Sequence, residues 1–332
     1  MQIPLIDAAA VEERLTWTAI ADAIEAGHRG PEAKIGDLLL RRGDDACLTR
    51  AAWLDGTGLA LKSVTVFPGN ADRRPPLPSV QGLVLLFDDR DGSLKALIDG
   101  PLVTKWKTAG DSVLGARLLA RPDSRRLLIL GSGVVAASLI EAYGEVFPDL
   151  REIEIWSRTA TNAARLADLH QSGPVRVRAV EEVEPAARDA DIIACATMAT
   201  APVLHGDWVQ PGSHVDLIGA FRPDMREADD ALITKAEIFV DSRETAIHDI
   251  GELAIPLAAG VISEADIRGA LPDLAAGKAG RSGPEAITLY KNGGGAHLDL
   301  MTAKVIAGLW QEDRSERGLD HAAALADSGP PR

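Results

Sequence analysis

A glycine-rich turn near the middle of the chain has the residue types and spacing that bind a dinucleotide phosphate. The apolar run 127–130 enters the turn Gly-Ser-Gly, and helical spacing then continues to Tyr143. This order is typical of the start of a Rossmann unit, although a plain strand–turn–helix segment can carry such glycines too. Free N–H groups at the start of the helix would bind the phosphate oxygens. The predicted pyrophosphate contacts are Gly131, Ser132, Gly133, Val134 and Val135.

The end of the next predicted strand indicates which nicotinamide cofactor binds. An acidic residue there usually accepts hydrogen bonds from the ribose of NAD, whereas the additional phosphate of NADP favours a cation. This chain has Ser157, Arg158 and Thr159 at that position. A guanidinium and two hydroxyls suit a phosphate, although Arg158 is also compatible with an ordinary surface position. We therefore predict NADPH as the cofactor, with NADH less favoured.

Two different patterns of secondary structure surround these motifs. From residue 125 onward strands and helices alternate, which predicts an α/β fold with a doubly wound parallel sheet. The strands expected there are 127–130, 152–156, 175–177, 192–196, 214–218 and 237–240, and a helix is expected at 263–268. Before Arg121, short strands separated by turns such as Asp91-Gly92 indicate an antiparallel sheet. Those strands are 46–53, 58–67, 82–87 and 94–98, followed by a helix at 101–119; the segment 30–40 is a weaker element.

The composition limits the classes of partner. The chain has 332 residues, enough for two domains, and its formal net charge of −14 argues against nucleic acid or an anionic membrane as a partner. No apolar run reaches the roughly 18 residues of a membrane span, and the N-terminus lacks the pattern of a signal peptide. Cys47 and Cys195 are too few for a disulfide framework, and the histidines lack metal-ligand spacing. We expect a cytoplasmic protein without a metal.

Several longer segments resemble the ornithine cyclodeaminase/mu-crystallin family. They are LKSVTVFPGN (61–70), TKWKTAGDSVLGARLLAR (104–121), CATMATAPVL (195–204), HVDLIGAFRPDMREAD (214–229) and KNGGGAHLDLMTAK (291–304). The resemblance implies a dinucleotide-dependent enzyme that acts at the carbon–nitrogen bond of α-imino and α-amino acids. It also implies a homodimer in which a Rossmann domain, residues 121–294, is inserted into an α+β substrate and dimerisation domain. Residues 1–120 and 295–332 would form that second domain.

Lys62 is the catalytic residue that the resemblance implies. It lies in the apolar strand LALKSVTVF, where a buried ammonium is costly unless it meets an anion, although a lysine on a strand edge can also reach solvent. The family match puts Lys62 in the substrate pocket, where it would hold a carboxylate or move a proton. Lys107 stands where the family usually has an arginine, so it loses the bidentate contact with a carboxylate. Arg41 or Arg42 is a further carboxylate-binding candidate, and either side chain can equally be solvated.

Further family matches concern the cofactor. Thr108 matches a threonine that contacts the pyrophosphate, and Gly293 lies in a turn that closes over the nicotinamide end beside the substrate. The glycine run around Gly293 can also be read as a flexible connector. The other residues that the resemblance assigns to the cofactor are Ser79, Thr197, Ile218, Gly219, Ala220 and Asn292.

The residue after Ala220 separates the activities of the family. Cyclodeaminases carry an aspartate in this stretch as a general acid/base, whereas this chain has Phe221, which cannot transfer a proton. The pattern GAFRPDMRE is instead similar to the reductase and mu-crystallin branch. We therefore predict NADPH-dependent reduction of a cyclic α-imino acid, Δ1-pyrroline-2-carboxylate or its piperideine homologue, to L-proline or L-pipecolate. The alternatives are an alanine-dehydrogenase-like oxidoreductase, an ornithine cyclodeaminase and a mu-crystallin-like NADPH-binding protein with little turnover.

Overall fold

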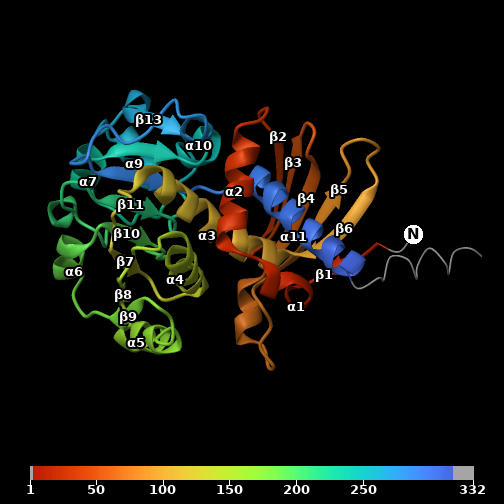
Figure 1. Ribbon diagram of the computed structural model, residues 1–332, viewed down its shortest axis with the longest axis horizontal. Helices are drawn as coiled ribbons and strands as arrows, with labels where there is room; N and C mark the ends of the chain where they lie inside the picture. The colour runs from red at the N-terminus through yellow and green to blue at the C-terminus, as the bar shows by residue number, and fades with distance from the viewer. Residues whose placement is uncertain (1–2, 317–332) are drawn as a thin grey trace, which may run out of the picture. The chain divides into compact units, whose positions relative to one another are not determined.

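The computed structural model describes residues 3–316 and divides the chain into two compact units, each of which is described by itself (Figure 1). Among the described residues, unit 1 comprises 3–23, 31–104 and 296–316, and unit 2 comprises 24–30 and 105–295. Two helices, α2 (Trp17–His28) and α3 (Gly100–Leu119), include residues of both units. The division therefore falls inside α3, whereas the sequence places a domain boundary after this helix; the boundaries at 120/121 and 294/295 stay a prediction.

Unit 1 contains a six-stranded sheet with the strand order β1-β6-β5-β4-β3-β2. The strands are β1 (Leu5–Ile6), β2 (Lys34–Arg42), β3 (Asp45–Leu54), β4 (Gly58–Val66), β5 (Val80–Phe87) and β6 (Leu94–Asp99). From β2 to β6 all neighbours are antiparallel, as predicted, and β1 adds a parallel edge. The weak element expected at 30–40 is part of β2. Gly43, with φ of 58°, makes the tight turn from β2 to β3 possible.

One long helix covers one face of this sheet. α11 (Ala296–Glu316) packs against β3 and β4 (Figure 1). Leu300, Ala303 and Ile306 of this helix are buried. Successive residues of a strand point to opposite faces, so the buried even-numbered positions of β4, Ala60 and Lys62, lie on the helix-covered face. The remaining helical segments of unit 1 are α1 (Ala8–Val11), η1 (Glu12–Arg14) and η2 (Pro68–Asp72).

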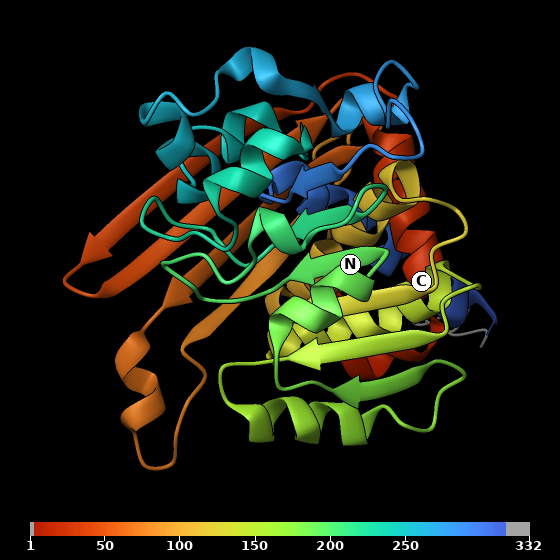
Figure 2. The same cartoon turned by 90° about the vertical axis from the view of Figure 1, so that its left-hand side faces the viewer.

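Unit 2 is a Rossmann-type domain. Its eight strands have the order β13-β12-β14-β11-β10-β7-β8-β9, and every pair is parallel (Figures 1 and 2). The strands are β7 (Arg126–Leu130), β8 (Glu152–Trp156), β9 (Arg176–Ala179), β10 (Ile192–Cys195), β11 (His214–Leu217), β12 (Glu237–Val240), β13 (Ile267–Ala270) and β14 (Thr288–Lys291). Most of their residues are buried, except in the edge strand β9, as expected for a parallel sheet with covered faces. The predicted fold class is confirmed.

The helices of unit 2 connect successive strands. They are α4 (Val134–Val146), α5 (Ala160–Leu169), α6 (Val183–Asp189), α7 (Asp230–Lys235), α8 (Arg243–Ala246), α9 (Gly251–Ala258) and α10 (Leu271–Ala275), with 3-10 turns η3 (Gly206–Trp208) and η4 (Glu264–Asp266). The helix predicted at 263–268 is wrong. Ser263 and Asp266 form a capping box around η4, and Ile267 then enters β13, because its side chain is buried at the sheet edge.

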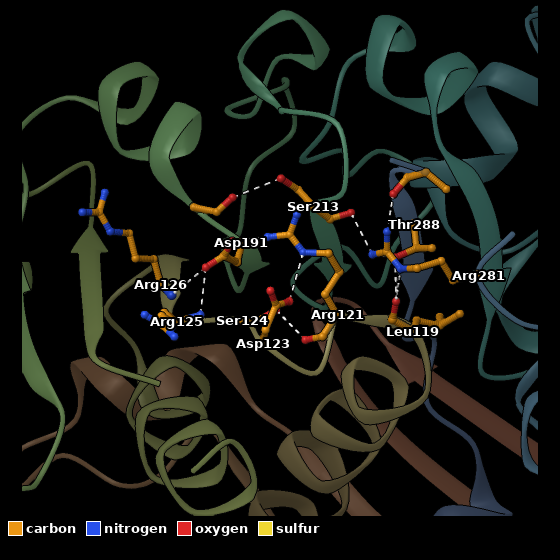
Figure 3. Close-up of polar contacts among 12 residues, drawn as sticks. Leu119, Arg121, Asp123, Ser124, Arg125, Arg126, Asp191, Ser213, Arg281 and Thr288 are labelled. Atoms are coloured by element: carbon orange, nitrogen blue, oxygen red, sulfur yellow. Dashed lines mark hydrogen bonds and ion pairs between the residues drawn. The ribbon is translucent and has the colours of Figure 1, made fainter. Parts of the chain in front are cut away.

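Polar contacts tie together the segments at the amino ends of these strands (Figure 3). Arg121 forms an ion pair with Asp191, with 2.5 Å between Nη2 and Oδ1, and Asp191 also accepts hydrogen bonds from the N–H groups of residues 125 and 126. Arg281 donates to the carbonyl of Leu119 at 2.7 Å and to the hydroxyl of Thr288 at 3.1 Å. This network fixes the edge of the sheet opposite to the glycine-rich turn, which follows the carboxyl end of β7.

Candidate functional site

The glycine-rich turn of unit 2 has the backbone geometry of a phosphate-binding loop. Gly131 has a φ of 130°, and a Cβ there would lie 2.4 Å from the carbonyl oxygen of Ala196, so only glycine fits. Gly133 is the N-cap of α4, and no side chain caps the helix at this residue. The N–H groups of Val134 and Val135 are therefore at the open positive end of the helix dipole. This geometry is compatible with the pyrophosphate of a dinucleotide, and binding by these residues stays a prediction.

The tip of β8 lies next to this turn. Ser132 Oγ donates to Ser157 Oγ at 2.9 Å, and Thr159 N donates to the same hydroxyl at 3.4 Å. Thr159 is also the N-cap of α5, and Arg158 between them is exposed. The structure thus brings together the predicted pyrophosphate and ribose contacts, and the tip presents one cation and two hydroxyls.

A buried carboxylate joins the loops that follow β10 and β11. Glu227 Oε1 accepts hydrogen bonds from both N and Oγ1 of Thr197 at 2.7 Å, and Oε2 accepts from the N–H groups of Gly219 at 2.7 Å and Ala220 at 3.2 Å. Burial, and next the charge of Glu252, raises the pKa of Glu227 to about 8. The sequence analysis did not single out Glu227; its signal was an acidic residue in the family stretch that ends READ.

The segment that follows β14 forms hydrogen bonds with α3 and with Asp241. Asn292 Nδ2 donates to the carbonyl of Thr108 at 3.2 Å and to Ser112 Oγ at 3.1 Å, so two predicted cofactor residues meet. Gly293 N donates to Asp241 Oδ2 at 2.9 Å. Lys107, only 7% exposed, donates from Nζ to the carbonyl of residue 295 at 3.4 Å. The glycine run is therefore held in place by hydrogen bonds, which argues against a flexible connector.

Lys291, at the end of β14, is a fully buried cation that the sequence analysis missed. Its Nζ donates to three carbonyl oxygens, those of Leu217 and Ala220 at 2.8 Å and that of Asn292 at 2.7 Å. A buried ammonium is costly unless all its donors are satisfied, and these acceptors satisfy them. Lys291 thereby links the ends of β11 and β14.

In unit 1, Lys62 lies between two side chains. Its Nζ donates to Thr104 Oγ1 at 2.7 Å and to Asp299 Oδ1 at 3.2 Å, and the exposed fractions of Lys62 and Asp299 are 8% and 1%. The sequence predicts that a buried Lys62 must meet an anion, and the chain itself supplies one from α11. Asp299 was missed because it lies 237 residues away along the chain. Its signal was a lone aspartate in the apolar stretch AHLDLM.

The other predicted residues of unit 1 lie apart from Lys62 along the sheet. Arg41 and Arg42 are exposed at the hairpin end of β2, and Arg42 pairs with Asp45 at 2.9 Å. Ser79 precedes β5, and its carbonyl accepts a hydrogen bond from Phe67 N. The residue directly opposite Lys62 in β3 is Arg50. Binding by Arg41, Arg42 and Ser79 stays a prediction.

Within the described residues 3–316 there is no metal-binding cluster, no membrane-spanning helix and no counterpart of the cyclodeaminase aspartate. Between residues 3 and 316, no cluster of at least three histidine, cysteine or acidic side chains has the arrangement of a metal site. None of the helices between residues 3 and 316 is both long enough and apolar enough to cross a membrane. Phe221 is 56% exposed, with the guanidinium of Arg222 5.8 Å from its ring centre, so no carboxylate replaces the cyclodeaminase aspartate at this position.

The parallel sheet, the glycine-rich turn and the uncapped helix define a Rossmann-type dinucleotide-binding domain. A family model places the chain more closely: residues 9–314 match the ornithine cyclodeaminase/mu-crystallin family, and the chain belongs to this family. The family predicted from the sequence is thus confirmed, as is the prediction that the chain is an enzyme.

Individual relatives are similar along most of their length. A Paracoccus denitrificans protein named Delta(1)-pyrroline-2-carboxylate reductase is 50% identical over 295 residues, which cover 89% of this chain and 93% of that protein. The structure of Thermococcus litoralis Delta(1)-pyrroline-2-carboxylate reductase with NADH and L-proline has a TM-score of 0.86 and 28% identity, covering 94% of this chain and 98% of that one. An archaeal alanine dehydrogenase dimer with bound NAD has a TM-score of 0.87 and 27% identity, covering 95% and 98%.

Proposed function

We propose that this enzyme reduces Δ1-pyrroline-2-carboxylate to L-proline with NADPH, and accepts the piperideine homologue as a second substrate. The observation that carries the proposal is the 50% identity, over 89% of the chain, to the Paracoccus denitrificans protein named for this reaction. The Thermococcus litoralis structure is described with NADH and L-proline, the cofactor class and the product that the reaction requires. Phe221 supports the reductase reading because it cannot act as the acid/base of a cyclodeaminase.

We assign the binding of the substrate carboxylate, and the holding of the proton, to positively charged side chains. The turn Gly131–Gly133 and the tip of β8 would hold NADPH, which would supply the hydride for the imine carbon when bound. The role left to the chain's own side chains is to bind the carboxylate and to keep the imine nitrogen protonated, so that the nitrogen can take the electron pair of the C=N bond. Lys62, which donates to Thr104 and Asp299, would hold the carboxylate or keep a proton at the imine nitrogen. Lys107 would supply a second positive charge, with Arg41 or Arg42 as a further candidate. Fixing the imine in position is the main contribution of these residues.

The preference for NADPH rests on the tip of β8. Arg158 is exposed there beside the hydroxyls of Ser157 and Thr159, which suits a 2′-phosphate through charge-assisted hydrogen bonds. The two solved relatives are described with NADH and with NAD, so both bind a nicotinamide cofactor without the 2′-phosphate. The preference of this chain for NADPH is therefore our own proposal. Titrating the protein with NADPH and NADH tests it: tighter binding of NADPH supports the assignment, and equal or weaker binding contradicts it.

An alanine-dehydrogenase-like activity is the second candidate. It is favoured by the TM-score of 0.87 to the archaeal alanine dehydrogenase and by the shared family. NADPH oxidation with pyruvate and ammonia, compared with pyrroline-2-carboxylate, separates the two activities. Tight NADPH binding without turnover of any imine would instead support the mu-crystallin-like binding protein.

A homodimer is the expected assembly, and one face of the sheet in unit 1 supports it. The face opposite α11 carries Leu38, Leu40, Trp53 and Leu83, which are 55%, 56%, 48% and 38% exposed. Large apolar side chains gathered on one sheet face are typical of a protein interface. The archaeal relative is described as a dimer. A molar mass of two chains in light scattering would support this assembly, and the mass of one chain would contradict it.

The cytoplasmic location of the protein stays a prediction.

A further inference from the structure

Glu227 connects two loops with two separate oxygens. Oε1 accepts two hydrogen bonds from Thr197, which follows β10, and Oε2 accepts the N–H groups of Gly219 and Ala220, which follow β11. Three of the four groups are backbone N–H donors that need an acceptor oxygen, and the fourth is the Thr197 hydroxyl, which can also accept the proton that Glu227 holds below its pKa of about 8. The side chain is fully buried within unit 2. One carboxylate therefore sets the spacing between the ends of two adjacent strands.

The loops that Glu227 joins are already in close contact. A Cβ on Gly219 would lie 2.1 Å from the carbonyl oxygen of Thr197 and 2.5 Å from Glu227 Oε1. The backbone of one loop thus packs directly on the other, and only glycine permits this approach. A small displacement of Glu227 would move both loops.

Glu227 is itself fixed in position by a second buried acid. Glu252 accepts hydrogen bonds from the N–H groups of Glu227 at 2.8 Å and Ala228 at 3.0 Å, and it is fully buried. On the other side of the loop, Lys291 donates to the carbonyl of Ala220 at 2.8 Å. The loop after β11 is therefore held by a carboxylate at its N–H groups and by an ammonium at its carbonyl.

We infer that Glu227 is a positioning residue for the nicotinamide half of the cofactor, acting through the loops of Thr197 and of Gly219 and Ala220. The inference rests on the proposed function only for the assignment of these loops to the nicotinamide end. The ADP half would depend on two other segments, the turn Gly131–Gly133 at the pyrophosphate and the tip of β8 at the ribose. Loss of Glu227 should therefore affect the two halves of the dinucleotide unequally.

The test compares two ligands on the variant Glu227→Gln. A glutamine replaces one of the two oxygens by an NH₂ group, so in either orientation at least one backbone N–H of the two loops loses its acceptor. We expect NADPH to bind about tenfold more weakly, whereas 2′-phospho-ADP-ribose, which lacks the nicotinamide, should change by less than about twofold. Isothermal titration with each ligand gives both numbers. Equal weakening of both ligands, or no change in either, would overturn the inference.

Two further variants serve as a control and as a second test. Glu237→Gln is the matched control, because Glu237 is also a buried acid that accepts from a backbone N–H, that of Ser282, but at the amino end of β12; it should leave both affinities unchanged. Glu252→Gln acts on the loops only through the Glu227 segment, so it should repeat the unequal effect more weakly, and it decides the matter if Glu227→Gln does not fold. Because binding is measured without an imine, failure of the proposed reduction would leave this test intact.

Discussion

Lys62 Nζ lies 3.2 Å from Asp299 Oδ1, and the two side chains come from opposite ends of the chain, on β4 and α11. Both are buried, and the same ammonium donates to Thr104 Oγ1. An aspartate that faces a buried lysine balances its charge and fixes its direction. Asp299 thereby favours the charged form of Lys62 and holds its Nζ at one defined point of unit 1, as the proposed binding of a carboxylate would need.

Removing this partner should cost both stability and activity. Asp299→Asn removes the negative charge that lies 3.2 Å from the buried ammonium, and we expect a loss of about 2–4 kcal/mol in the free energy of unfolding, with the amide retaining part of the contact. Urea unfolding measures this loss, and kcat/KM should fall with it. Asp224→Asn is the control, because Asp224 pairs with Arg222 at the surface; it should leave the unfolding free energy nearly unchanged. An equally small effect of Asp299→Asn would mean that the Lys62 pair is not important.

Alanine substitutions at the two glycines of the phosphate-binding turn should have different effects on stability and on dinucleotide binding. Gly131→Ala introduces a Cβ 2.4 Å from a carbonyl oxygen at a φ of 130°, so it should destabilise the fold and prevent dinucleotide binding. Gly133 has a φ of −87° and no atom within 4 Å of its Cβ position, so Gly133→Ala should keep the melting temperature and weaken only the dinucleotide. Thermal unfolding and NADPH titration of both variants measure the difference. A similar loss of stability in both would contradict it.

Arg158→Ala should affect the phosphate of NADPH specifically. Loss of a charge-assisted hydrogen bond of about 1.5–3 kcal/mol corresponds to roughly ten- to hundredfold weaker NADPH binding, whereas NADH should change little. Arg176→Ala removes an exposed arginine at the amino end of β9 and serves as the control. If Arg158→Ala weakens both dinucleotides equally, the cofactor assignment is wrong.

Two buried groups of β11 should give stability opposite dependences on pH. Burial raises the pKa of Asp216 from 3.8 to about 7, so the folded state holds a proton that the unfolded state releases, and this group makes stability fall as pH rises through that window. Burial, assisted by Arg281, lowers the pKa of His214 from 6.5 to about 3, so this group makes stability fall as pH drops from 6.5 to about 3. Relative to the wild type, Asp216→Asn should therefore gain stability and His214→Asn should lose stability as pH rises from about 4 to 6.5.

Urea unfolding at several pH values between these limits tests both slopes. Each single proton changes the free energy of unfolding by about 1.36 kcal/mol per pH unit. Parallel curves for the wild type and either variant would show that the buried group does not titrate differently in the folded and unfolded states.

The sequence predicts the local features well because they depend on neighbouring residues. The apolar run before Gly131, the turn itself and the following helix are all read within one short segment, and the same holds for the tip at Arg158. Asp299 and Glu227 escape such reading, since each acts on residues far along the chain and the contact arises only when strands and helices pack. The helix wrongly expected at 263–268 has a related cause: burial at the edge of the sheet, rather than local spacing, places Ile267 in β13.

The most direct measurement of the central claim is the oxidation of NADPH by the purified protein in the presence of Δ1-pyrroline-2-carboxylate. Absorbance at the nicotinamide wavelength follows the cofactor, and chromatography on a chiral phase follows the amino acid. We predict one L-proline formed for each NADPH consumed, at a kcat/KM well above that for pyruvate with ammonia. No proline formation with this imine, combined with turnover of pyruvate and ammonia, would contradict the account.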